Sequence, residues 1–131
     1  MLEDASNSIA ILVNPMSGEE FNVRRYSTSI GRDLGNDVVV ASDRTMSRQH
    51  ALVQFINGKF YVQDLQSKNG TRLNGGAVTN MMKVLNSGDE LSVGLTRLIF
   101  LLIPAADIAS WDSGAMTETV DPVVPRALAA R

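Results

Sequence analysis

Hydrophobic positions along this chain fall in short runs and not in long amphipathic stretches. Runs rich in Val, Ile, Leu, Phe and Tyr recur between turn signals, and none has the length or the 3.6-residue period of a substantial helix. The pattern predicts an all-β body. We expect roughly ten strands, at residues 9–13, 20–24, 27–30, 37–40, 49–56, 60–65, 71–73, 81–85, 90–93 and 97–103.

Turn residues separate these runs. Asn and Gly recur between them because both tolerate positive φ, which tight turns require. Asn57-Gly58 is the strongest of these signals, and it predicts that the strands at 51–56 and 59–64 pair directly as a hairpin. Many short strands joined by such turns favour an antiparallel β-sandwich or barrel.

The chain changes character near residue 105. From Asp107 onward Ala, Ser, Pro and Thr dominate, strand periodicity disappears, and Pro122 and Pro125 break any regular element. We therefore divide the chain into a lead at 1–8, one domain at 9–104 and a mostly irregular tail or linker at 105–131. Met1 indicates a natural start, whereas the Pro- and Ala-rich end leaves open whether another domain follows.

Composition and charge narrow the class of protein. A chain of 131 residues that is 44% hydrophobic can bury one sizeable core. Its formal net charge of -2 supplies no basic field for DNA or RNA, so we expect no nucleic-acid partner. The sequence contains no cysteine, which excludes disulfides and thiolate metal sites and fits a reducing compartment. We expect a cytoplasmic location.

Membrane and enzymatic functions find little support. The apolar stretch at 98–106 is shorter than a bilayer span and contains Pro104. The N-terminus lacks the apolar run of a secretory signal. His50 is the sole histidine, and Ser47 beside it lacks the glycine pattern of a nucleophile elbow. We expect no catalysis, no cofactor, no metal and no membrane contact.

Four short polar elements carry the remaining chemistry. They follow one another at fixed spacing at the ends of predicted strands: Gly31-Arg32, Ser47-Arg48-Gln49-His50, Ser67-Lys68-Asn69-Gly70-Thr71 and Asn74-Gly75. Each dipeptide alone is common, but the ordered set closely resembles the signature of the forkhead-associated (FHA) domain family. The resemblance covers about residues 9–103.

The resemblance implies an eleven-stranded β-sandwich whose loops at one end bind a phosphothreonine peptide. Arg32 and Ser47 match the family's phosphate-binding residues, and Arg48 takes a position that adds a phosphate or peptide contact. Lys68 and Asn69 match the second loop, where the asparagine holds the peptide main chain. Residues that match positions supporting the site are Gly31, His50, Gly70, Thr71 and Asn74.

The side-chain chemistry independently suits such a ligand. A phosphothreonine carries about -1.5 to -2 charges and strong acceptor oxygens, so it requires charged or neutral donors. Arg32 offers a planar fork, Ser47 a rotatable hydroxyl, and Asn69 both a donor and an acceptor for an extended backbone. Residues that determine preference around the phosphothreonine are expected at Arg44, Thr45 and the 94–96 turn, with an acidic or apolar preference left open.

Two alternatives remain at this stage. Alone, each residue has an ordinary explanation, because surface arginines are usually solvated and Asn-Gly is often only a turn. If these ordinary explanations apply to the site residues, the chain is a phosphate-independent assembly scaffold with the same fold.

The tail adds a separate hypothesis. Thr117 and Thr119 lie beside acidic residues, and a Ser/Thr kinase that phosphorylates them would turn the tail into a ligand for the domain's own site. The ordinary explanation of that segment is a linker.

Overall fold

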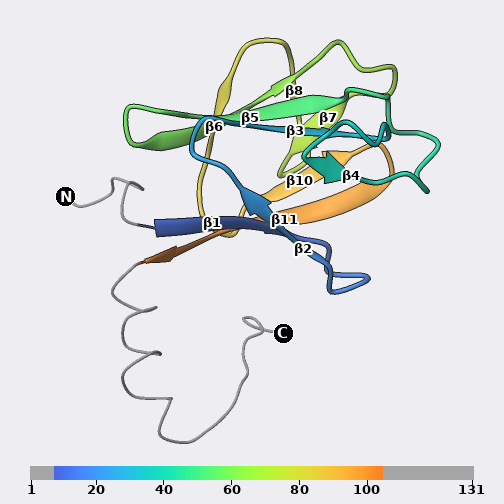
Figure 1. Cartoon of the computed structure of the whole chain (residues 1–131). Coiled ribbons are helices and arrows are strands. Elements are labelled where there is room, and N and C mark those ends of the chain that lie inside the picture. The colour runs from blue at the N-terminus through green and yellow to red at the C-terminus, as the bar shows by residue number, and fades with distance from the viewer. Residues whose placement is uncertain (1–7, 105–131) are drawn as a thin grey trace, which may run out of the picture.

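The computed structural model describes residues 8–104, and every regular element within that range is a strand. This confirms the all-β prediction (Figure 1). In chain order the eleven strands are β1 (Ser8–Val13), β2 (Glu20–Val23), β3 (Ser27–Gly31), β4 (Val38–Val39), β5 (Ala51–Ile56), β6 (Lys59–Asp64), β7 (Thr71–Leu73), β8 (Gly76–Val78), β9 (Lys83–Leu85), β10 (Glu90–Val93) and β11 (Thr96–Pro104).

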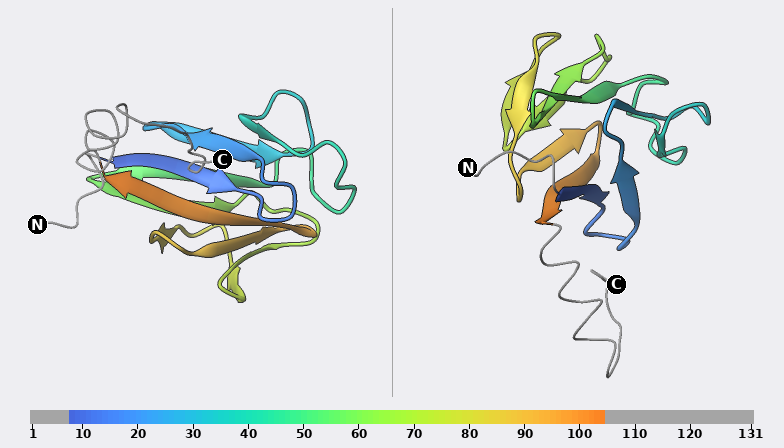
Figure 2. Two further views of the ribbon diagram at one scale, coloured as in Figure 1. Left: turned by 90° about the horizontal axis from the view of Figure 1, so that it is seen from below. Right: turned by 60° about the vertical axis from the view of Figure 1, so that its left-hand side comes forward.

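The strands form two sheets that pack face to face as a sandwich (Figures 1 and 2). The six-stranded sheet has the order β2-β1-β11-β10-β7-β8, and the five-stranded sheet has the order β4-β3-β5-β6-β9. All neighbours with a recorded register are antiparallel except β3 and β4, which run parallel, with Ile30 opposite Val38. The exception arises because the chain leaves β3, loops out over 32–37 and returns beside the strand it left, where Asp37 accepts a hydrogen bond from the Ser29 N–H (2.9 Å).

The hairpin predicted from Asn57-Gly58 is confirmed. β5 and β6 pair directly, with Ile56 opposite Lys59, and the two turn residues have φ of 51° at Asn57 and 84° at Gly58. Positive φ at both positions is the geometry of a type I′ turn, which matches the twist of the flanking strands.

Several element boundaries differ from the sequence prediction. The sequence predicts no strand between residues 73 and 81, but Gly76 begins β8, because Asn74 and Gly75 alone complete a two-residue turn and Gly76 pairs with Leu73. Met81 and Met82 were assigned to a strand but are exposed residues before β9. β5 begins at Ala51, two residues later than predicted, so His50 belongs to the preceding loop; β1 in turn begins at Ser8.

The core lies between the sheets. Alternate residues of both sheets are withdrawn from solvent, including Leu12, Ile30, Val53, Val62 and Phe100. The rings of Phe60 and Phe100, one from each sheet, lie 5.4 Å apart between centroids. Within residues 8–104 no helix has the length and apolar character needed to cross a membrane. The packed core gives the loops at one end a rigid base.

Candidate phosphopeptide-binding site

Three loops that are distant in sequence meet at one end of the sandwich. They connect β3 to β4 (32–37), β4 to β5 (40–50) and β6 to β7 (65–70). Together they enclose an open pocket of about 420 Å³. Its lining includes all five residues predicted to bind ligand, and the full set is Arg32, Arg44, Thr45, Met46, Ser47, Arg48, Gln49, Lys68 and Asn69.

Gly31 allows the first two loops to approach each other. A Cβ at this position would lie 2.1 Å from the Arg48 carbonyl oxygen and 2.6 Å from the Asn36 amide nitrogen. The Asn36 amide itself joins the loops by donating to the Arg48 carbonyl (2.7 Å) and to the Asp33 carbonyl (2.9 Å). Sequence analysis missed Asn36, because an asparagine in a loop indicates only a local turn, and its partner Arg48 lies on another loop.

The backbone and the Nε atom of Arg32 are held by hydrogen bonds, whereas its terminal nitrogens face the pocket. Its backbone N–H donates to the Ser47 carbonyl (3.0 Å), and its side-chain Nε donates to the Met46 carbonyl (3.1 Å). Within residues 8–104 its terminal nitrogens have no hydrogen bond or ion pair. The guanidinium therefore has a fixed direction and retains the paired donors that suit a phosphate.

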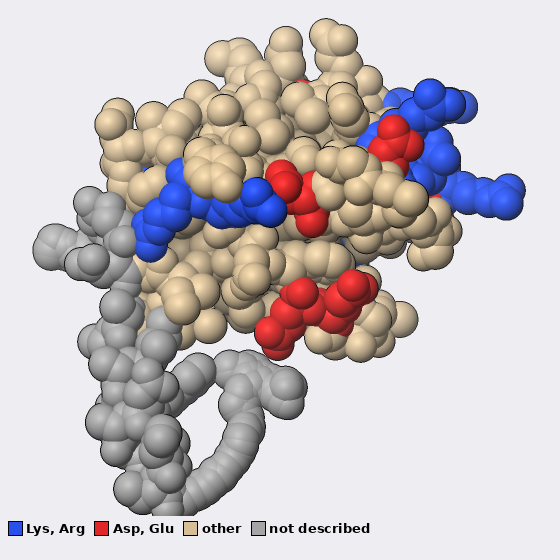
Figure 3. Space-filling model, viewed as in Figure 1, with Lys and Arg blue, Asp and Glu red and all other residues tan. Residues whose placement is uncertain are grey.

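The pocket carries unpaired positive charge. Among the described residues, no carboxylate lies within ion-pair distance of the four cationic side chains that line it: Arg32, Arg44, Arg48 and Lys68. Lysine and arginine side chains gather at this end of the molecule (Figure 3). Their mutual repulsion is relieved by an anion, which makes an anionic ligand the natural occupant.

Ser47 joins the second and third loops. Its Oγ accepts a hydrogen bond from the Lys68 backbone N–H (2.9 Å), so the hydroxyl hydrogen remains able to donate to a ligand oxygen. Asn69 makes the second tie, since its Nδ2 donates to the Thr45 carbonyl (2.7 Å). In the part of the chain that the structure describes, the Asn69 Oδ1 has no donor, and one Nδ2–H is also unused.

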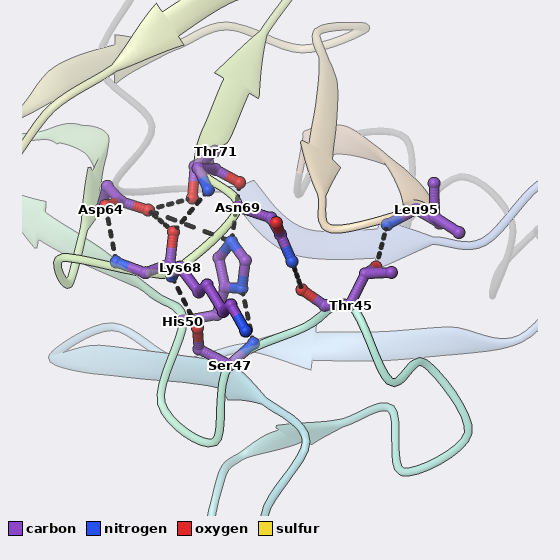
Figure 4. Close-up of polar contacts among 10 residues, drawn as sticks. Thr45, Ser47, His50, Asp64, Lys68, Asn69, Thr71 and Leu95 are labelled. Atoms are coloured by element: carbon purple, nitrogen blue, oxygen red, sulfur yellow. Dashed lines mark hydrogen bonds and ion pairs between the residues drawn. The ribbon is translucent and has the colours of Figure 1, made fainter.

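His50 lies beneath the pocket and does not line it (Figure 4). Its side chain is fully buried. Nδ1 accepts from the Ser47 N–H (2.9 Å), which places the ring proton on Nε2, and Nε2 donates to the Gly70 carbonyl (2.8 Å). The imidazole thus holds the second and third loops together from below, an arrangement that supports the structural role expected for it.

Asp64, which sequence analysis missed, organises the third loop (Figure 4). Its Oδ1 accepts from the hydroxyls of Ser67 and Thr71 (2.5 and 2.6 Å), and its Oδ2 accepts from the Ser67 N–H (3.0 Å). Burial opposes its ionisation, but these hydrogen bonds outweigh burial and lower the pKa of Asp64 below its ordinary value. The signal was an aspartate three residues before a serine, a spacing suited to a local turn.

A second aspartate joins the residues expected to govern peptide preference. The Asp43 carboxylate accepts from the Thr45 hydroxyl, from the Leu95 N–H (3.0 Å) and from the Thr96 hydroxyl (2.6 Å). Burial again opposes ionisation, and the hydrogen bonds lower the pKa of Asp43. The turn with Gly94 therefore lies against Thr45, where Leu95 is 81% exposed beside the pocket.

Other predicted residues lie away from the pocket. Thr71 is buried beneath it, whereas Asn74 bonds to Asp89 and Glu90 at the start of β10 and does not line it. Thr117 and Thr119 lie outside the described residues. β11 begins beside the pocket loops and ends at Pro104 at the other end of the sandwich (Figure 1), and its nine residues span about 30 Å.

Comparison with known proteins agrees with this geometry. The model of the FHA domain family matches residues 28–94. The glycogen accumulation regulator GarA of Mycolicibacterium smegmatis is 36% identical over 87% of this chain and 68% of its own length. The oxoglutarate dehydrogenase inhibitor of Corynebacterium efficiens is 35% identical over 80% of this chain and 72% of its own length.

Solved structures give the same answer for the fold. An FHA domain studied for phosphothreonine-dependent interactions superposes with a TM-score of 0.67 at 27% sequence identity, covering 74% of this chain and 98% of that domain. The family match, the identity to relatives, the eleven-stranded sandwich and the pocket lining all agree. This chain belongs to the FHA domain family.

Proposed function

We propose that the chain is a phosphothreonine-dependent peptide-binding module that mediates protein–protein interaction in Ser/Thr kinase signalling. One observation supports this proposal most directly: four cationic side chains that have no ion-pair partner within residues 8–104 converge with a serine hydroxyl and an asparagine amide on one pocket. The binding activity resides in residues 9–104. The module recognises and does not catalyse.

Each pocket residue has a distinct role in this proposal. The Arg32 fork binds two phosphate oxygens, and the Ser47 hydroxyl donates to a third. Lys68 and Arg48 add positive charge at the rim. Asn69 binds the peptide backbone beside the phosphothreonine, because its Oδ1 and one N–H are unused while Thr45 fixes the amide plane.

Charge also constrains the peptide. Four cations line the pocket, whereas a phosphothreonine supplies only about two negative charges. The excess favours acidic residues next to the phosphothreonine, and Arg44 is the cation that remains once the phosphate is bound by the others. We therefore propose an acidic phosphopeptide as the ligand class.

Calorimetric titration with three matched peptides tests the function. We expect binding of the phosphothreonine peptide, weaker binding of its phosphoserine counterpart and no measurable binding of the unphosphorylated peptide. Equal affinity for phosphorylated and unphosphorylated peptides would instead support the scaffold alternative. A peptide in which the flanking acidic residues are replaced by alanine tests the acidic preference separately.

The names of the relatives indicate what kind of control the module exerts. They are named as a regulator of glycogen accumulation and an inhibitor of oxoglutarate dehydrogenase, so we propose that this chain likewise controls partner proteins by binding them. A Ser/Thr kinase that creates the phosphothreonine is implied. We place the protein in the cytoplasm, where such kinases and partners meet.

A further inference from the structure

A second surface lies far from the phosphate chemistry. β1 and β11 are adjacent antiparallel strands, and both are apolar on their two faces. Their inward residues, such as Leu12 and Phe100, belong to the core cluster. Alternation along a strand turns the other residues outward. These outward residues, here called the β1–β11 strip, are Ile9, Ile11, Val13, Ile99, Leu101 and Ile103.

The strip is continuous across the two strands. The register pairs Ile9 with Ile103, Ile11 with Leu101 and Val13 with Ile99, which makes three apolar rows side by side. Figure 2 (left) looks onto β1 and β11 from this side. Within residues 8–104 no strand packs over the face. Ile9 is 48% exposed, Ile11 at the centre of the strip is only 7% exposed, and the other four residues are partly exposed. A contiguous, partly exposed apolar strip of this kind marks a surface for a binding partner.

We propose that the strip is the docking surface for the segment that follows β11, residues 105–116, with Trp111 seated on it. The segment starts where the strip ends, because Pro104 pairs with Ser8 one position beyond Ile9 and Ile103. Trp111 is the only tryptophan of the chain, and Ile108 and Met116 add apolar surface near it.

The chain between Pro104 and Trp111 is long enough to reach every row of the strip and short enough to keep Trp111 close to it. Six residues separate Pro104 from Trp111, and the seven Cα-to-Cα steps between them span at most about 23–25 Å. The rows from Ile103 to Ile99 extend about 14 Å along β11. Every row is therefore within reach, and a short tether gives the segment an effective concentration in the millimolar range. Weak apolar contacts suffice under those conditions.

Charge at the two ends of the strip favours the rows near Pro104. Arg25 donates to the Ser8 carbonyl (2.5 Å), which places a cation at the end where the segment begins. The segment carries Asp107 and Asp112. At the opposite row, Glu20 lies across from Val13 and contributes negative charge, whereas Glu90 lies across from Ile99 but is in an ion pair with Arg97 (3.4 Å). Docking therefore places Trp111 against Leu101 and Ile103.

A second copy of the chain fits the strip less well. Stable protein–protein interfaces bury roughly 800 Å² per partner. The strip has six aliphatic side chains, and none of them is more than half exposed. An area of this size suits one short tethered segment better than an isologous dimer.

Trp111 provides the test, because its fluorescence reports on its own environment without contributions from another tryptophan. In the full chain we expect emission at shorter wavelength than that of N-acetyltryptophanamide and several-fold slower quenching by acrylamide. Leu101→Asp should reverse both, since losing the burial of one leucine lowers the docking equilibrium by about tenfold or more. Nuclear Overhauser effects from the Trp111 indole to the methyl groups of Leu101 and Ile103 give a direct second measurement.

The matched control is Leu52→Asp, a half-buried outward position on β5 in the other sheet. It should leave Trp111 protected, and circular dichroism should show that both variants fold. Trp111 with solvent-like emission in the full chain, or protection that survives Leu101→Asp, would overturn the proposal. A dimer in sedimentation that Leu101→Asp dissociates, with Trp111 solvent-exposed throughout, would assign the strip to a second copy and would equally overturn it. None of these readouts depends on phosphopeptide binding.

Discussion

The rim of the pocket, where side chains face the ligand, differs from its floor, the buried layer beneath, in whether the polar groups already have hydrogen-bond partners. On the rim, the charged groups of Arg44, Arg48 and Lys68 have no hydrogen bond within the described residues, although their backbones are fixed. On the floor, His50 and Asp64 use their polar atoms within the protein. An anion site needs donors that are unused and that are held by a layer whose own hydrogen bonds are complete. Such donors do not have to reorganise when the ligand binds. The predictions below separate the two layers.

The largest effect is expected on the floor, at His50→Ala. The change leaves the Ser47 N–H and the Gly70 carbonyl without partners and opens a cavity, so the free energy of unfolding should fall by about 2–4 kcal/mol. Denaturant unfolding measures this loss. His50→Asn, which retains an acceptor near Nδ1, should lose less. An unchanged unfolding midpoint together with abolished phosphopeptide binding would show that His50 belongs to the binding layer.

Arg32→Ala tests the rim at its deepest residue. Losing a charge-assisted fork costs about 1.5–3 kcal/mol per contact, so phosphopeptide affinity should fall by at least about tenfold. Stability should change little, because only the hydrogen bond to the Met46 carbonyl is lost from the folded protein. Arg32→Lys should also bind more weakly, since an ammonium lacks the fork. Near-normal affinity in calorimetry would remove Arg32 from the site.

Acid should lower the free energy of unfolding, because protonation of Asp64 weakens its hydrogen bonds in the floor of the pocket. Its pKa is lowered in the folded protein relative to the ordinary value of 3.8, so the unfolded chain takes up the proton first as pH falls. The stabilisation is therefore complete above the unfolded pKa and is lost as pH falls through the folded pKa. Asp64→Asn should remove about 1–2 kcal/mol near neutrality and flatten this acid dependence. Unfolding measured from pH 7 to pH 2 checks it, and parallel curves for both proteins would contradict it.

The smallest effect is expected at the outer rim, at Lys68→Ala. An exposed ammonium contributes about 0.5–1 kcal/mol, so affinity should fall only about two- to fivefold. The loss should shrink at high salt, because screening already weakens the contact. Stability should not change, since the loop is held by the Lys68 backbone N–H and not by its side chain. A salt-independent loss greater than tenfold would place Lys68 in direct contact with the phosphate.

The sequence predicted the strands better than their ends. Asn57-Gly58 fixed one hairpin because the turn chemistry is local. The strand that begins at Gly76 was not predicted, because a Gly beside a turn has no side chain to reveal that it pairs with Leu73. Asp64 and Asn36 were missed for a similar reason. Their hydrogen-bond partners lie on the facing loop or a few residues ahead, and no apolar periodicity marks them.

The sequence by itself determined the donors, the β class and the order of the polar loops, since these depend on residue type and local turn preference. Tertiary structure decided which donors remain unused. Arg32, Ser47 and Asn69 lie on three loops, and they share one pocket because Gly31 lets backbones meet and His50 joins the second loop to the third. Local preference cannot specify such contacts, because they form only when the two sheets pack and bring distant strand ends to the same edge.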